Sequence, residues 1–174
     1  MLRDFIVIEN KPAITIYKAA AAMVTGMAVQ ITDTAGTNSD EKQAKFAAAG
    51  TADNLYFTNK ERIPVGINTA RASHSDYDND FNQIASGELV KLEKFYAGEE
   101  FLTDAKGTGA AKGKVVMADT DGKLVKATVA VAAVGEDPAV PAVESCYLYV
   151  DDVVDNGHTL MHIRVLDKPQ ANLA

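Results

Sequence analysis

The stretch Gly113-Lys-Val-Val-Met-Ala-Asp-Thr-Asp-Gly-Lys-Leu-Val125 decides the fold. Two β-prone runs, 114–117 and 123–131, flank its centre, Asp119-Thr120-Asp121-Gly122. An Asp-Gly pair between such runs indicates a hairpin, because the turn needs a positive φ that glycine adopts without strain. The stretch therefore predicts two antiparallel strands joined by a tight turn.

The same reasoning applies twice more in the C-terminal half. Residues 145–150 and 159–166 flank a loop that contains Asp155-Asn156-Gly157, which predicts a second hairpin. Residues 132–143 contain two prolines and are predicted to be a connecting loop. We expect residues 87–166 to form a small antiparallel β-sandwich or barrel.

A short pattern recurs at three predicted strand starts. A glycine stands three residues before a valine in Gly26-Met-Ala-Val29, Gly87-Glu-Leu-Val90 and Gly113-Lys-Val-Val116. Each copy predicts a turn that leads into a strand. The irregular spacing of the copies is not that of a solenoid repeat.

The N-terminal half is predicted to be less regular. Residues 1–17 are β-prone, with a turn at Asn10-Lys11-Pro12, and indicate an extended N-terminal arm or hairpin before a single β-rich domain, 18–174. Residues 38–50 have capping residues at one end and Gly50 at the other, which predicts one short helix. Residues 33–86 resemble a polar insertion, and 64–86 a long loop available for contacts.

Composition excludes several classes of function. The 174-residue chain has 17 Lys and Arg against 24 Asp and Glu, which gives a net charge of -7. A negative net charge does not favour binding to the phosphate backbone of a nucleic acid. One cysteine, Cys146, allows no intrachain disulfide. No apolar run is long enough to span a bilayer, and the charged N-terminus is unlike a signal peptide. We expect a protein made in the cytoplasm, with no membrane or direct nucleic-acid contact.

The sequence signals for a metal site or a catalytic site are weak. The carboxylates of Asp76, Asp78 and Asp80 imitate the opening of an EF-hand, but Phe81 occupies the position that needs glycine. His158 and His162 would lie roughly 13 Å apart on an exposed strand face, too far to share a metal ion. Cys146 lies in an apolar run and is predicted to be a small buried residue rather than a nucleophile. We predict no catalytic residue, no metal site and no cofactor.

The chain resembles head decoration, or cement, proteins of tailed bacteriophages. The resemblance rests on short stretches of similar sequence spread over most of the chain: residues 26–33, 52–66, 75–81, 86–90, 97–104 and 113–125. Lambda-type decoration proteins are shorter, so residues 33–86 would be additional material and a trimeric arrangement does not transfer directly.

The resemblance implies a structural virion protein on the capsid surface, which stabilises the lattice by bridging major capsid proteins. It also implies a homo-oligomer, a trimer or dimer. The expected partner contacts lie in the N-terminal arm and the polar loop: Phe5, Ile6, Val7, Ile8, Ile14, Ile16, Tyr17, Arg62, Tyr77, Asp78 and Phe81.

Two alternatives stay open. One is another phage structural subunit, from a tail tube or head fibre. The weaker one is a metal-dependent hydrolase with a dispersed site at His74, Asp76, Asp78 and Asp80. A carbohydrate-binding module is disfavoured because the chain has no Trp to stack on sugars.

Overall fold

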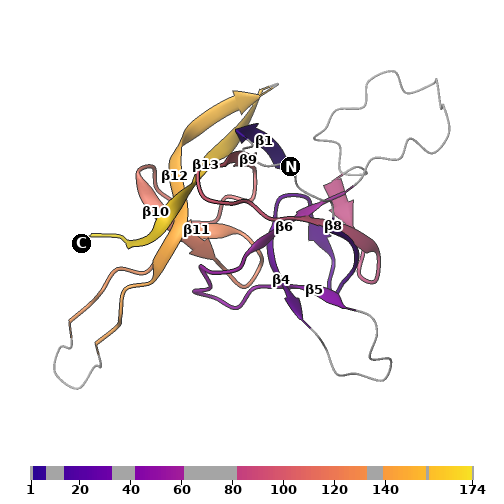
Figure 1. Cartoon of the computed structure of the whole chain (residues 1–174), viewed down its shortest axis with the longest axis horizontal. Coiled ribbons are helices and arrows are strands. Elements are labelled where there is room, and N and C mark those ends of the chain that lie inside the picture. The colour runs from indigo at the N-terminus through magenta and orange to yellow at the C-terminus, as the bar shows by residue number, and fades with distance from the viewer. Residues whose placement is uncertain are drawn as a thin grey trace.

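The computed structural model describes residues 2–6, 14–32, 42–60, 82–132, 139–155 and 157–173. These residues are mainly β, as the sequence predicts (Figure 1). The strands are β1 (Leu2–Ile6), β2 (Ile14–Ala19), β3 (Met23–Val24), β4 (Ala28–Thr32), β5 (Gln43–Phe46), β6 (Tyr56–Asn59), β7 (Gln83–Ile84), β8 (Leu89–Glu93), β9 (Glu100–Thr103), β10 (Lys114–Ala118), β11 (Leu124–Lys126), β12 (Glu144–Asp155) and β13 (His158–Ala171).

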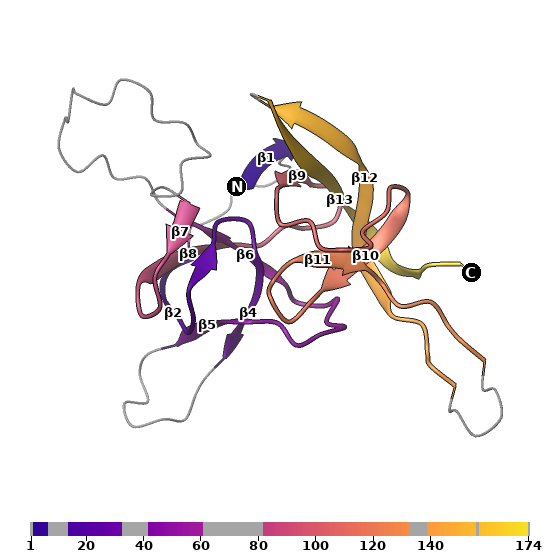
Figure 2. The same ribbon diagram turned by 180° about the vertical axis from the view of Figure 1, so that it is seen from behind.

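A closed barrel forms in the order β2-β5-β4-β6-β8 (Figure 2). The barrel agrees with the predicted class, but of the range 87–166, where the sequence places a sandwich or barrel, the described strand that joins it is β8. The barrel is also not purely antiparallel, because β2 and β5 pair in parallel. The polar stretch 33–86 supplies β5 and β6 to the barrel.

The second half forms most of a six-stranded sheet in the order β1-β9-β13-β12-β10-β11. Both predicted hairpins are confirmed: β10 pairs with β11 across Asp119 to Lys123, and β12 pairs with β13 up to Asp155 and His158. A two-stranded ribbon of β3 and β7 completes the described elements.

The described parts of the N-terminal segment, residues 2–6 and 14–17, lie in strands that pair with the rest of the body. Strand β1 is paired along β9, with Leu2 opposite Thr103, and β2 belongs to the barrel between β5 and β8. The expected boundary between arm and domain at residue 17 therefore falls inside a barrel strand. Ladder pairing with distant strands, which local sequence does not reveal, incorporates both segments.

The helix predicted over 38–50 is wrong for the residues that the structure describes. Residues 43–46 form β5, which pairs with β4 and places Ala44 in the barrel interior at 0% exposure. A short isolated helix is marginal, and the capping signals contribute less than a full set of barrel hydrogen bonds. Tertiary pairing therefore overrides the local preference.

The glycine pattern at strand starts is confirmed. Gly26, Gly87 and Gly113 all have positive φ and lead directly into β4, β8 and β10. The valines that follow them, Val29, Val90 and Val116, are all buried.

One core cluster spans the barrel and the sheet, and the barrel also has a cluster of its own. The Phe57 ring of β6 lies 4.5 Å from the Phe101 ring of β9 and 5.7 Å from the Tyr147 ring of β12, measured between centroids. Hydrogen bonds also cross between the two: Thr103 Oγ1 donates to the Gly26 carbonyl at 3.0 Å, and the Ala28 amide donates to the Gly122 carbonyl at 2.7 Å. This joint core makes the scaffold a single packed body.

Candidate contact surface and buried ion clusters

A bulge in β12 determines where the charged side chains of the sheet lie. Tyr149 pairs with Ile163, but Asp151 pairs with His162, so Val150 is an extra residue in β12. An extra residue reverses the alternation of side chains along a strand. Asp151 therefore faces outward beside His162, while Asp152 lies on the same face as Tyr149.

The outer cluster joins β9, β12 and β13. His162 Nε2 lies 2.6 Å from Glu100 Oε2, and its Nδ1 lies 2.9 Å from Asp151 Oδ1. Arg164 Nε donates to the other Glu100 oxygen at 2.5 Å. The His162 and Glu100 side chains are only 8% and 6% exposed. His162 is thus buried, which corrects the expectation of an exposed strand face; His158 is exposed as expected.

The chemistry of the outer cluster is that of a structural ion network. Both nitrogens of the His162 ring face carboxylate oxygens, so the imidazole bridges Glu100 and Asp151. Burial raises the pKa of Glu100, but bonds and charges from Arg164 and His162 outweigh it and hold that pKa below its usual value. Because the two ring nitrogens point to different carboxylates, these residues do not converge on one metal ion.

The inner cluster lies around the Tyr149 hydroxyl. That hydroxyl donates to Asp152 and accepts from Lys106 Nζ at 2.5 Å, and Lys112 Nζ lies 2.9 Å from the second Asp152 oxygen. Hydrogen bonding from Tyr149, with further bonds from the two lysines, lowers the pKa of Asp152 to about 2 despite burial. The cluster ties both ends of the loop 104–113, between β9 and β10, to β12.

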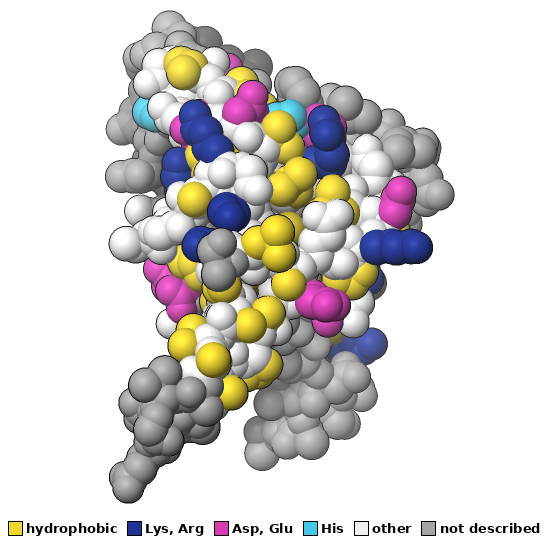
Figure 3. Space-filling model, turned by 90° about the vertical axis from the view of Figure 1, so that its left-hand side faces the viewer, with side chains coloured by type: hydrophobic (Ala, Val, Ile, Leu, Met, Phe, Trp, Pro, Cys, Tyr) yellow, Lys and Arg dark blue, Asp and Glu magenta, His cyan; other side chains and the backbone are white. Residues whose placement is uncertain are grey.

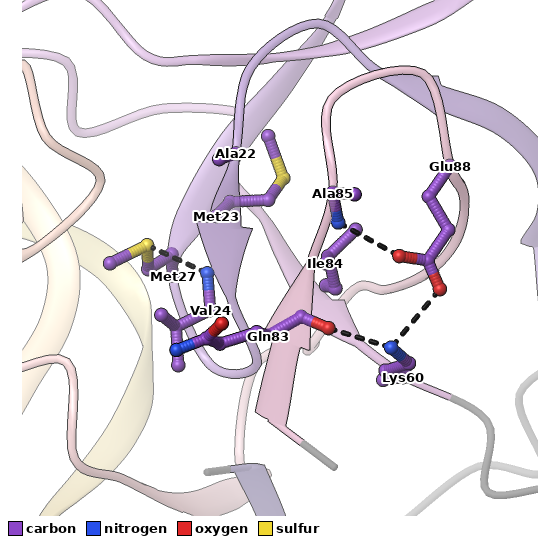
Figure 4. A pocket seen from close by; sticks show the side chains of 9 residues that line it. All are labelled: Ala22, Met23, Val24, Met27, Lys60, Gln83, Ile84, Ala85 and Glu88. Atoms are coloured by element: carbon purple, nitrogen blue, oxygen red, sulfur yellow. Dashed lines mark hydrogen bonds and ion pairs between the residues drawn. The ribbon is translucent and has the colours of Figure 1, made fainter. Parts of the chain in front are cut away.

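A hollow of about 760 Å³ lies beside the β3–β7 ribbon (Figure 4). Its walls include Met23, Met27 and Ile84, and its two charged residues bind each other, since Lys60 Nζ lies 3.1 Å from Glu88 Oε1. Glu88 also accepts the Ala85 amide at 2.8 Å, and this bond, assisted by Lys60, lowers its pKa. The carboxylate is therefore held in place by the scaffold.

Cys146 is less buried than the sequence predicts. It is half-buried and packs against the main core, and burial raises the pKa of its thiol. A raised pKa reduces the thiolate fraction that a nucleophile needs. Among the described residues, no three His, Cys, Asp or Glu side chains are grouped as a metal site.

Apolar side chains are exposed at two projecting hairpins. The first, here called the apolar arm, comprises the described residues 127–132 and 139–143 and leaves the body below β11 and β12 (Figure 1). Its Val131 and Val140 are 55% and 44% exposed. The second is the β12–β13 hairpin, near whose end Val154 is 71% exposed. Figure 3 shows hydrophobic side chains gathered over the lower part of the face nearest the arm.

The predicted contact residues have different outcomes. Phe5 and Ile6 lie in β1, and Ile14, Ile16 and Tyr17 lie in β2; Tyr17 is half-buried against the barrel core. The remaining predicted contacts and the hydrolase candidates fall outside the described residues: Val7, Ile8, Arg62, His74, Asp76, Tyr77, Asp78, Asp80 and Phe81. The apolar arm was missed, although its uncharged Ala and Val run was a visible signal.

Together these features define a β-rich protein in which two partly exposed ionic clusters cross-link strands and a loop. No protein-family model matches the sequence, and no curated protein or solved structure matches it significantly. No helix within the described ranges is long and apolar enough to cross a membrane.

Proposed function

We propose that this chain is a structural protein of a phage particle, one that binds the outside of the capsid and stabilises the lattice by bridging major capsid proteins. The observation that carries the proposal is the course of β12. This strand begins at the apolar arm and ends at the β12–β13 hairpin near Val154, so it connects two exposed apolar ends (Figure 1). The steps between the first and last of its 12 residues, at about 3.3 Å each, span at most roughly 36 Å.

A bridging role requires that contacts at the two ends be held at a fixed separation. β12 is paired on both sides, with β13 and β10, and the Glu100–His162–Asp151 cluster fixes its outer face. Pairing with β13 along most of β12, and with β10 at Leu148 and Tyr149, supports a fixed separation of the two ends. The net charge of -7 also supports this role, because like charges keep a densely arrayed protein soluble before assembly.

The test is binding of the purified chain to phage heads, measured by co-sedimentation. We expect binding to expanded heads and none to unexpanded heads. Val154→Asp should weaken binding at least about tenfold, because burying a charge in an apolar contact is unfavourable. Leu89→Asp is the matched control, since Leu89 is 64% exposed on the barrel, away from β12.

The competing assignment is a tail-tube or head-fibre subunit. Purified chain that polymerises into tubes without capsids would favour it. Failure to bind either form of the head would contradict the capsid role.

A further inference from the structure

An amine, a carboxamide and a carboxylate meet where β6 pairs with β8 (Figure 1). Asn59 of β6 lies directly opposite Lys91 of β8, and Glu93 follows Lys91 by two residues. Residues two apart on a strand, and residues opposite each other in an antiparallel pair, point to the same face. Because Leu92, which lies between the two β8 residues, packs in the barrel core, these three side chains lie on the outer face of the barrel.

One carboxylate oxygen contacts both of the other groups. Glu93 Oε1 accepts a hydrogen bond from Asn59 Nδ2 at 2.6 Å and lies 3.3 Å from Lys91 Nζ. The Lys91 and Glu93 side chains are only 26% and 15% exposed, and Glu93 lies opposite Phe57, which is fully buried. The amine and the carboxamide are therefore neighbours, joined by a group that can take up and return a proton.

A second lysine and asparagine contact each other without such a group. Lys94 Nζ donates to Asn54 Oδ1 at 3.3 Å in an exposed position. Within the described part of the chain, no carboxylate bonds to either of these side chains. The contact between Lys91 and Asn59 thus differs from an ordinary surface pair in its burial and in its shared carboxylate.

We propose that Lys91 and Asn59 join in an isopeptide bond, which the protein forms by itself with Glu93 as the proton carrier. Lys91 Nζ gives a proton to Glu93 and attacks Asn59 Cγ. The bond between Nζ and Cγ forms, the bond between Cγ and Nδ2 breaks, and the amide nitrogen leaves as ammonium with protons that pass through Glu93. Glu93 ends as the carboxylate that it was at the start, and no further reactant is consumed.

Proximity makes this reaction feasible. An amine and an amide that are free in water do not exchange readily, but groups that are fixed side by side react as if at an effective concentration of about 10⁵ M or more. The pairing of β6 with β8 fixes the two residues in this way before any bond forms.

The bond closes a covalent loop between residues 59 and 91, so β6 and β8 cannot separate. The single cysteine of the chain allows no disulfide that could do the same. A cross-link stabilises a fold mainly by restricting the unfolded chain, and for a loop of this length the melting temperature should rise by about 10 °C. This inference goes beyond the proposed capsid role and does not depend on it.

The experiment is intact mass spectrometry of the purified full chain under denaturing conditions, after incubation at about pH 7 and about pH 9. We expect a mass lower than that of the sequence by one ammonia, with a faster loss at the higher pH because the attacking amine must be neutral. Digestion should yield a branched peptide that joins Lys91 to Asn59.

Three variants locate the reaction. Lys91→Arg keeps the positive charge but has no amine to attack, and Glu93→Ala removes the proton carrier. Both should keep the full mass and melt about 10 °C below the cross-linked parent. Lys94→Arg is the matched control and should lose ammonia as the parent does. If Glu93→Ala does not fold, Lys91→Arg decides the question, because it retains a cation beside Glu93.

Two results would overturn the proposal. One is a full mass for the parent chain at both pH values, which would make the three residues an ordinary hydrogen-bonded ion pair. The other is a loss of ammonia that persists in Lys91→Arg, which would place the reaction elsewhere in the chain. Either result leaves the capsid role to its own test.

Discussion

The Nε2 atom of His162 lies 2.6 Å from Oε2 of Glu100, and both side chains are more than nine-tenths buried. This contact crosses from β13 to β9, and Asp151 extends it to β12 on the other ring nitrogen. Three neighbouring strands are thereby locked by one imidazole. The next four predictions test this and the other contacts that hold the scaffold rigid.

His162→Ala should lower the free energy of unfolding by about 2–4 kcal/mol, because it leaves the buried Glu100 carboxylate with Arg164 as its only remaining partner in this cluster. Urea denaturation measures the change. The control is His158→Ala at the exposed start of β13, expected within about 0.5 kcal/mol of the parent. Equal effects of the two variants would mean that the cluster does not stabilise the sheet.

Acid should weaken the fold through Asp152. The pKa of Asp152 is about 2 in the folded chain, against an ordinary value of 3.8. Its contribution to the free energy of unfolding is therefore complete above about pH 4 and is lost as the pH falls toward 2. Glu100, whose pKa is also lowered, acts in the same direction. The melting temperature of Asp152→Asn should therefore depend less steeply on pH below 4 than that of the parent, as measured by thermal melts. An unchanged slope would contradict the role given to Asp152.

Gly122→Ala should destabilise the junction between the β10–β11 hairpin and the barrel. Gly122 has φ +75°, and a Cβ there would lie 2.8 Å from Phe46 Cδ1. Backbone strain and overpacking together should lower the free energy of unfolding by about 2–4 kcal/mol. Gly157→Ala is the matched control, with φ +82° but open space around the Cβ, and should cost only about 1 kcal/mol. Similar losses would show that the contact with Phe46 relaxes freely.

Asn172→Ala should release the C-terminus. The Asn172 side chain accepts from the Val115 amide at 2.9 Å and donates to the Val115 and Ala127 carbonyls at 2.9 and 3.0 Å. Because these buried bonds are lost, the free energy of unfolding should fall by about 2–3 kcal/mol, and amide exchange in β10 should become faster. Leu173→Ala, at a side chain that is 81% exposed, should change neither. Unaltered exchange at Val115 in Asn172→Ala would refute the role.

Local sequence determined the β class, both C-terminal hairpins and the three glycine-led strand starts. Asp121-Gly122 and the turn before His158 need backbone angles that few residues other than glycine adopt, so their signals do not depend on the rest of the chain. Val29, Val90 and Val116 were placed in strands by the same short-range chemistry. Their burial agrees with that placement.

Tertiary structure alone decided where these strands pair. Residues 43–46 have the signals of a helix, yet Ala44 lies inside the barrel because pairing with β4 and β2 supplies hydrogen bonds that the local chain cannot. Nothing in the sequence around Val150 marks it as a bulge, yet that one residue turns Asp151 toward His162 and Asp152 toward Tyr149. A strand's register depends on its partner, and a shift of one residue exchanges its faces.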